Sequence, residues 1–158
     1  MDPTRIPGAW DTFFALQRRL DADIEQFYAQ RGIAGMRSRF ALPMVRLAHE
    51  GPLTIRDLAA SLDRTHSALS QTVAALREAG MVYTVPGSDA RTRLVDLTAR
   101  GRELGPLIEA EWRATEAVVA ELDREVSAPL SYIAAELAAR VEARPMSERL
   151  AAHLAEPE

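Results

Sequence analysis

The stretch that decides the fold runs from Leu53 to Leu76 and reads LTIRDLAASLDRTHSALSQTVAAL. Thr54 stands where a helix N-cap is expected, with Asp57 three residues further on. The small side chains of Ala59 and Ala60 would let a second helix approach closely, and that helix begins near Thr65. Two short helices joined by a tight turn are the layout of a helix-turn-helix.

The second helix of this stretch has two different faces. Its apolar positions, which we expect to be buried, are Leu69, Val73 and Leu76. Its opposite face carries Ser67, Ser70, Gln71 and Ala74. Short polar side chains allow a helix to enter the major groove of DNA, where Ser and Gln can hydrogen-bond base edges. The predicted DNA-binding residues of this recognition helix are Arg64, Thr65, His66, Ser67, Ser70, Gln71 and Arg77.

A β-hairpin is predicted directly after this helix. The run Met81–Val85 favours a strand, Pro86–Ala90 reads as a loop, and Arg93–Leu97 forms a second strand. The loop and its flank supply the candidate wing residues Asp89, Arg91 and Arg93. An Arg at a loop tip can enter the narrow minor groove, and a carboxylate two residues earlier can hold its guanidinium in a bidentate pair. Taken alone, the same pattern also fits a solvated hairpin with a surface ion pair.

The remaining segments read as helices, which makes the fold class mainly α with a small hairpin (α+β). One amphipathic helix is expected over residues 9–30, a second over 40–49 and a long one from Thr98 to about Arg124. Pro106 falls inside the long helix and should kink or break it. Ser127 and Pro129 suit the N-cap and first turn of a further helix, and a short final helix can start near Ser147.

Composition excludes several classes of protein. The chain of 158 residues has no Cys, which removes disulfides and thiolate metal sites, and the His residues show no metal-ligand spacing. No apolar run is long enough for a membrane span, so we expect a cytoplasmic protein without a membrane partner. The net charge is −4, yet residues 37–102 hold ten Arg against six acids, a local net of +4. A basic middle between acidic ends is expected where only the middle faces a polyanion.

The run from Leu76 to Leu104, LREAGMVYTVPGSDARTRLVDLTARGREL, resembles the MarR family of winged helix-turn-helix regulators. The likeness rests on three features: Leu76-x-x-x-Gly80 at the helix end, Asp89-x-Arg91 in the wing, and the Leu97-Thr98-x-x-Gly101-x-x-Leu104 helix start. The resemblance implies a homodimer on double-stranded DNA, with Arg91 in the minor groove and Asp89 supporting it. It also implies an N-terminal dimerisation helix (1–36), a DNA-binding domain (37–98) and C-terminal dimerisation helices (99–158).

The resemblance raises one further expectation, a small aromatic effector, although we expect no cofactor and no metal. Residues that could line its pocket are Phe14, Phe40, Met44, His49 and Trp112. Core or interface packing is the competing interpretation for these aromatics, because such side chains usually supply buried area.

The function predicted from the sequence is a DNA-binding regulator, in the form of a repressor released by a ligand. The alternative is a winged-helix module that binds a protein instead of DNA, which the scarcity of cations on the recognition helix favours. An enzyme is not expected, because the chain has no phosphate-binding loop, no dinucleotide fingerprint, no nucleophile elbow and no histidine cluster.

Replacing the wing arginine tests the wing prediction. Arg91→Ala should weaken binding to all DNA sequences and lower the slope of log affinity against log salt by about one unit, because one phosphate-neutralising cation is lost. Salt titrations of both proteins on one duplex measure this slope. An unchanged slope would contradict the wing assignment.

Overall fold

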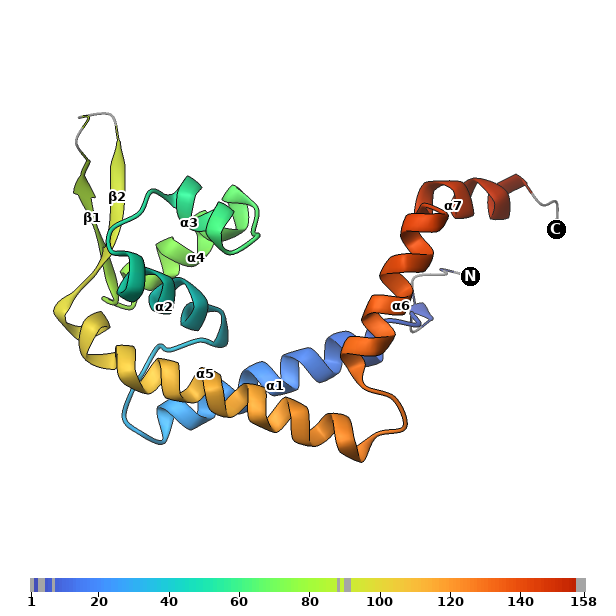
Figure 1. Cartoon of the computed structure of the whole chain (residues 1–158), viewed down its shortest axis with the longest axis horizontal. Helices are drawn as coiled ribbons and strands as arrows, with labels where there is room; N and C mark the ends of the chain where they lie inside the picture. Colours follow the sequence, from blue (N-terminus) through green and yellow to red (C-terminus); the bar gives the residue numbers. More distant parts are fainter. Residues whose placement is uncertain (1, 3–4, 7, 88, 90–91, 156–158) are drawn as a thin grey trace. The chain divides into compact units, whose positions relative to one another are not determined.

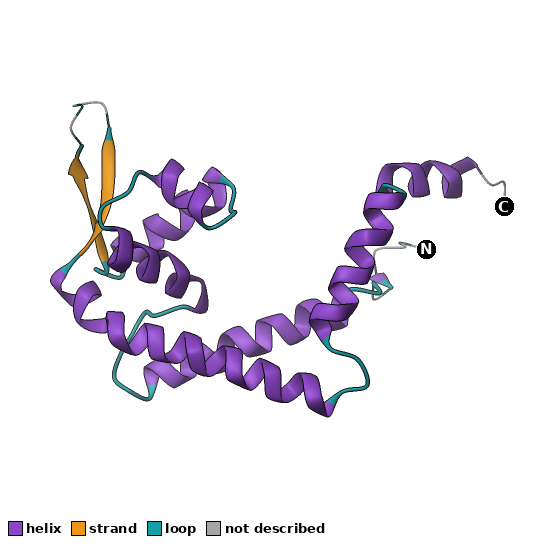
Figure 2. Ribbon diagram, viewed as in Figure 1, coloured by secondary structure: helices purple, strands orange, loops and turns teal. Residues whose placement is uncertain are grey.

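The structure, a computed structural model, describes residues 2, 5–6, 8–87, 89 and 92–155. It consists of two compact units, Met1–Trp112 and Arg113–Glu158. Figures 1 and 2 show their helices and the hairpin. The elements are α1 (Asp11–Ala29), η2 (a 3-10 turn, Ser38–Phe40), α2 (Ala41–Glu50), α3 (Ile55–Ser61), α4 (His66–Glu78), β1 (Val82–Pro86), β2 (Arg93–Leu97), α5 (Ala99–Glu125), α6 (Leu130–Ala143) and α7 (Met146–Ala155). The predicted fold class, mainly α with a hairpin, is confirmed.

Two threonines begin the helices of the helix-turn-helix. The Thr54 side chain accepts a hydrogen bond from the backbone N–H of Asp57 at 3.0 Å, as expected for an N-cap. Thr65 caps α4 in the same way, by accepting from the N–H of Ala68 at 3.2 Å. Between them, Asp63 has a φ of 50°, a left-handed conformation that Asp tolerates better than most residues. These local interactions set where each helix starts and how sharply the chain turns.

The two strands pair antiparallel, with Val82 opposite Leu97 at the base and Pro86 opposite Arg93 toward the tip. β2 is held on its other side by Leu53, which exchanges two backbone hydrogen bonds with Val95 at 2.7 and 3.1 Å. The base of the hairpin is therefore anchored to the segment that precedes α3.

One hydrophobic core unites the first unit. α2 packs against β2, α3 packs against α4, and α4 packs against β1 (Figure 1). Each large apolar side chain buried here contributes about 1.5–3 kcal/mol relative to an exposed one. The largest fully buried side chains are Tyr28, Phe40, Met44, Leu58, Leu76, Met81, Val95, Leu97 and Ile108.

The start of α5 is packed tightly against the start of β1. The Thr98 hydroxyl donates to the Gly80 carbonyl at 2.8 Å, and the Thr98 N–H donates to the Met81 carbonyl at 3.0 Å. Gly101 lies so close that a Cβ there would overlap the Met81 carbonyl oxygen. The glycine is therefore required by this close approach.

The break expected at Pro106 does not occur, because α5 is one helix from Ala99 to Glu125 with Pro106 inside it. A proline disfavours helical geometry in the preceding residue partly through a clash with that residue's Cβ. Here the preceding residue is Gly105, which has no Cβ, so that clash is absent, although the helix still lacks the hydrogen bond of the missing proline N–H. Burial of Ile108, two residues further along α5, helps to offset that loss.

Two further bonds join α5 to other helices of the first unit. The Tyr28 hydroxyl donates to the Glu111 carboxylate at 3.1 Å, with both residues buried. Burial, together with this carboxylate, raises the pKa of Tyr28 above its ordinary value, so the tyrosine remains a neutral donor. His49 of α2 lies 2.9 Å from Glu109 at the surface.

The second unit contains the end of α5 with α6 and α7. α6 begins after Pro129, and its first N–H, that of Leu130, is bonded by the Asp123 carboxylate at 3.1 Å. The expected N-cap at Ser127 is therefore wrong, because Asp123 supplies the acceptor. None of the residues of α6 or α7 is buried. Among the described residues, no helix is long and apolar enough to cross a membrane.

Gly101→Ala should lower the free energy of unfolding by about 2–3 kcal/mol, because the added methyl group meets the backbone of Met81. Urea denaturation measures the effect. Gly8→Ala is the control, since a Cβ there meets only the Asp11 side chain at ordinary contact distance, and it should change stability by less than about 0.5 kcal/mol. Equal stability of the two variants would contradict the close approach.

Candidate nucleic-acid interface

Helix α4 has one face in the core and one in solvent. Leu69, Val73 and Leu76 are 3% exposed or less and lock this helix onto the core. Because 3.6 residues make one turn, burying these positions forces the opposite positions outward. On that side Ser67, Gln71 and Ala74 are exposed, and Ser70 is half-buried beside Leu69. The predicted orientation of the two faces agrees with this arrangement, while the contacts that its residues make with DNA stay a prediction.

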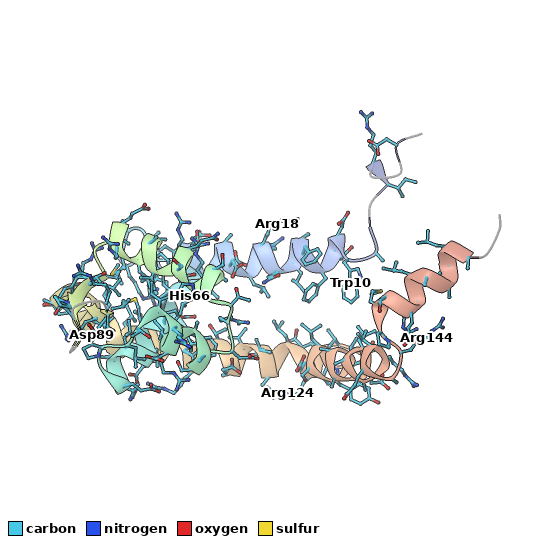
Figure 3. The ribbon with its side chains drawn as sticks, turned by 90° about the horizontal axis from the view of Figure 1, so that it is seen from above. Trp10, Arg18, His66, Asp89, Arg124 and Arg144 are labelled. Carbon is cyan, nitrogen blue, oxygen red and sulfur yellow. The ribbon has the colours of Figure 1, made fainter. Side chains whose placement is uncertain are left out.

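Basic side chains and a capping residue lie at the ends of α4. Arg64 before the helix, His66 in its first turn and Arg77 in its last turn are all exposed. Figure 3 labels His66, and also Asp89 of the wing. Thr65 differs from the rest of the predicted set, because its oxygen is engaged in capping α4. The middle of the exposed face is therefore uncharged, and the arginines lie near its two ends, Arg77 beside the exposed acid Glu78.

The hairpin provides the wing that was predicted after this helix. Asp89 and Arg93 are exposed, and Thr92 donates its N–H to the Asp89 carbonyl at 2.9 Å. The Gly87 N–H donates to the Thr92 carbonyl at 2.9 Å, which closes the loop. Arg91, the residue predicted to enter the minor groove, lies outside the described residues.

Sequence reasoning missed a polar cluster at the base of the wing. The carboxylate of Asp96 on β2 accepts from the guanidinium of Arg102 at 2.6 Å and from the Tyr83 hydroxyl at 3.2 Å. Its other oxygen accepts from the backbone N–H of Leu97 at 2.7 Å. The hydrogen bond to Asp96 raises the pKa of Arg102. The sequence carried only a weak signal, a charged residue between two apolar strand positions.

The structure does not bring the five predicted effector residues around one cavity. Phe40 and Met44 are each 1% exposed and belong to the core, whereas Phe14 is an exposed residue of α1. His49 borders a hollow of about 270 Å³ beside Leu42, Val45, Arg46 and Leu62. Trp112 lines a different cavity of about 210 Å³ between α2, α4 and α5. The residues around this cavity are Ser38, Arg39, Leu42, Pro43, Leu62, Arg64, Ala68, Leu69, Thr72 and Trp112.

A buried helix face, an outward polar face and an adjacent two-stranded wing define a winged helix-turn-helix protein. Among the described residues, no group of three or more His, Asp or Glu side chains is placed to hold a metal ion. The arrangement offers hydrogen-bonding side chains and guanidinium groups, which suit recognition of a polyanion.

Comparison with known proteins supports this classification. The model of the MarR family matches residues 45–92. The DNA complex of S. aureus MepR has a similar fold, with a TM-score of 0.62 and 18% identity over 87% of this chain and 98% of that one. The DNA complex of the M. tuberculosis regulator MosR has a TM-score of 0.58 and 21% identity over 89% of this chain and 100% of that one.

A third similar structure is a SlyA-like regulator from Listeria monocytogenes, with a TM-score of 0.57 and 16% identity over 97% of this chain and 99% of that one. No curated protein matches the chain. The resemblance to the MarR family that the sequence predicts is thus confirmed. The family match lies in the helix-turn-helix and the wing, and the fold is shared over most of the chain.

Gln71→Ala should change which operator sequences are preferred, by about 1–3 kcal/mol at one base position, because Gln71 is exposed in the middle of the outward face of α4. Competition binding with a set of single-base operator variants measures this preference. Arg77→Ala is a suitable comparison, since loss of a phosphate contact weakens all sequences alike. If relative preferences stay the same in Gln71→Ala, this residue does not contact a base.

Proposed function

We propose that this protein is a sequence-specific DNA-binding transcription regulator that acts as a homodimer on a pseudo-palindromic operator. The observation that carries the proposal is the outward face of α4, which carries short polar side chains and lies beside a wing. A helix of this kind fits the major groove, which is wide enough to admit it. The DNA complexes of MepR and MosR, which share the fold, support the same function. MarR proteins are regulators and not enzymes, so we propose no catalytic activity.

Unpartnered apolar surface supports the homodimer. In the second unit, α6 carries Leu130, Ile133, Leu137 and Val141 along one stripe, and each is 39–50% exposed. In the first unit, the apolar stripe of α1 is also exposed from Phe13 to Leu20. Soluble monomers rarely expose large apolar patches, so these helices need a partner. A second copy of the chain is the partner that also supplies the second recognition helix for a two-fold operator.

Charge distribution supports a contact limited to the middle of the chain. Residues 37–102 have a local net of +4 in a chain whose net charge is −4. The acidic remainder would repel DNA, which favours binding through one surface only. A protein that binds chromosomal DNA in this way would act in the cytoplasm of a prokaryotic cell.

We further propose that the regulator is a repressor released by a small aromatic effector that carries an acid group. The cavity of about 210 Å³ beside Trp112 is large enough for one substituted ring. Its apolar lining suits the ring, and Arg39 and Arg64 suit a carboxylate. Ala68, Leu69 and Thr72 of α4 form one of its walls, so an occupant would bear directly on the recognition helix. A ligand that prefers a shifted α4 would lower the affinity for DNA.

Fluorescence anisotropy with labelled intergenic DNA beside the protein's own gene tests the function. The wild-type protein should bind at low salt, resist competitor DNA and lose affinity steeply as salt rises, because phosphate contacts release counterions. Benzoate, used as the effector probe, should lower the anisotropy of a preformed complex. A folded protein that fails to bind at low salt would instead favour a module that binds another protein.

A double substitution in α6 tests the homodimer. Ile133→Asp with Leu137→Asp should give a folded monomer that binds the operator at least about tenfold more weakly, because neither residue is buried within the chain. Analytical ultracentrifugation measures the mass of the protein in solution, and circular dichroism checks that the variant is folded. Glu136→Gln, an exposed neighbour on the same helix, is the control and should remain dimeric. A dimeric double variant would show that α6 is not an interface.

A further inference from the structure

The cluster of Tyr83, Asp96 and Arg102 joins three elements at the base of the wing. Tyr83 and Asp96 are direct cross-strand partners in the hairpin. Arg102 is the fourth residue of α5. The Asp96 side chain is 11% exposed, whereas that of Arg102 is 54% exposed. Both carboxylate oxygens of Asp96 accept hydrogen bonds, so its position is fixed from the strand and from the helix at once.

Because Arg102 is half exposed, water screens this ion pair, and the pair adds less to the stability of the fold than a fully buried one. Because this ion pair lies at the base of the hairpin, it affects the angle at which the hairpin projects. The hairpin extends three residues beyond Tyr83 to Pro86, about 10 Å at 3.3 Å per residue, before the loop begins. A tilt of about 10° at the base would then move this end by about 2 Å, which is enough to break hydrogen bonds to a DNA groove.

The other contacts at the base, which include the packing of α2 against β2, act at different points of the hairpin. Thr98 and Gly101 fix the start of β1 at Gly80 and Met81, below the first residue pair of the hairpin. Leu53 fixes β2 through Val95, by backbone bonds at the opposite edge of that strand. The Asp96–Arg102 bond is a side-chain connection that ties the body of β2 directly to α5.

We propose that Asp96 is a positioning residue for DNA binding, which acts with Arg102 and Tyr83 to hold the wing at a fixed angle to helix α5. This inference rests on the proposed DNA-binding function and adds to it a residue that does not touch DNA. Asp96 acts through the wing residues that it places, and Arg102 serves as its partner instead of as a phosphate contact.

The substitution Asp96→Asn tests the proposal, because it keeps the shape of the side chain and removes its charge. Operator affinity should fall roughly tenfold, the order expected when one groove contact is lost, with little change in melting temperature. Hydroxyl-radical footprinting should lose the protection given by the wing and keep that given by α4. Hydrogen exchange of the strand amides should accelerate at least about fivefold in free protein, while core amides stay unchanged.

Two further variants separate positioning from charge. Arg102→Ala should weaken binding without changing the salt slope, and adding it to Asp96→Asn should cause no further loss, because the two residues act as a unit. Arg100→Ala is the charge control, since Arg100 also lies near the start of α5 and, within the described part of the chain, donates to the carbonyls of Ala79 and Ala34. It should leave wing protection and strand exchange unchanged.

The outcomes distinguish this proposal from the proposed function. A wild-type protein that does not bind DNA would refute both the function and the role of Asp96 in it. A wild-type protein that binds, beside an Asp96→Asn variant with unchanged affinity, footprint and exchange, would refute the positioning role alone. A salt slope lowered by about one unit in Arg102→Ala would show that Arg102 contacts a phosphate directly and would also overturn the proposal.

Discussion

The burial of one face of α4 is the interaction on which the rest of the structure depends. Leu76 is fully buried, Leu69 and Val73 nearly so, and together they fix the rotation of this helix about its own axis. A helix that rolled by one residue would move its apolar side chains by about 100° and expose them to water. The outward direction of Ser67 and Gln71 is therefore set by the free energy of the core, and the exposed face itself needs no stabilising contact.

The same core also places the wing. Met81 and Val82 follow α4 directly and are buried, so the first strand starts from a fixed point. The close approach of Gly101 to the Met81 backbone holds the start of α5 at that point. Helix α4, the wing and the long helix α5 thus meet around a few residues.

Much of this arrangement is readable from local patterns. The cap at Thr54, the start of α4 near Thr65, the end of α4 before Gly80 and the two strands were all predictable, because each depends on residues within a few positions of one another. Predictions of where a helix starts or breaks failed where another residue, close by or several positions away, changed the local hydrogen bonding or removed a clash. Asp123 bonds the first N–H of α6 and displaces the expected cap at Ser127, and Gly105 relieves the clash that should have broken α5 at Pro106.

The sequence by itself determined the order of elements, the two faces of α4 and the family resemblance, because hydrophobic periodicity, capping residues and turn chemistry act over short stretches of chain. Only the tertiary structure decided which aromatic side chains are core and which line a cavity, since Phe40 is buried in the core and Trp112 lines a cavity. It also decided that Asp96 meets Tyr83 and Arg102. Contacts between separate elements depend on how the whole core packs, and no local pattern specifies them.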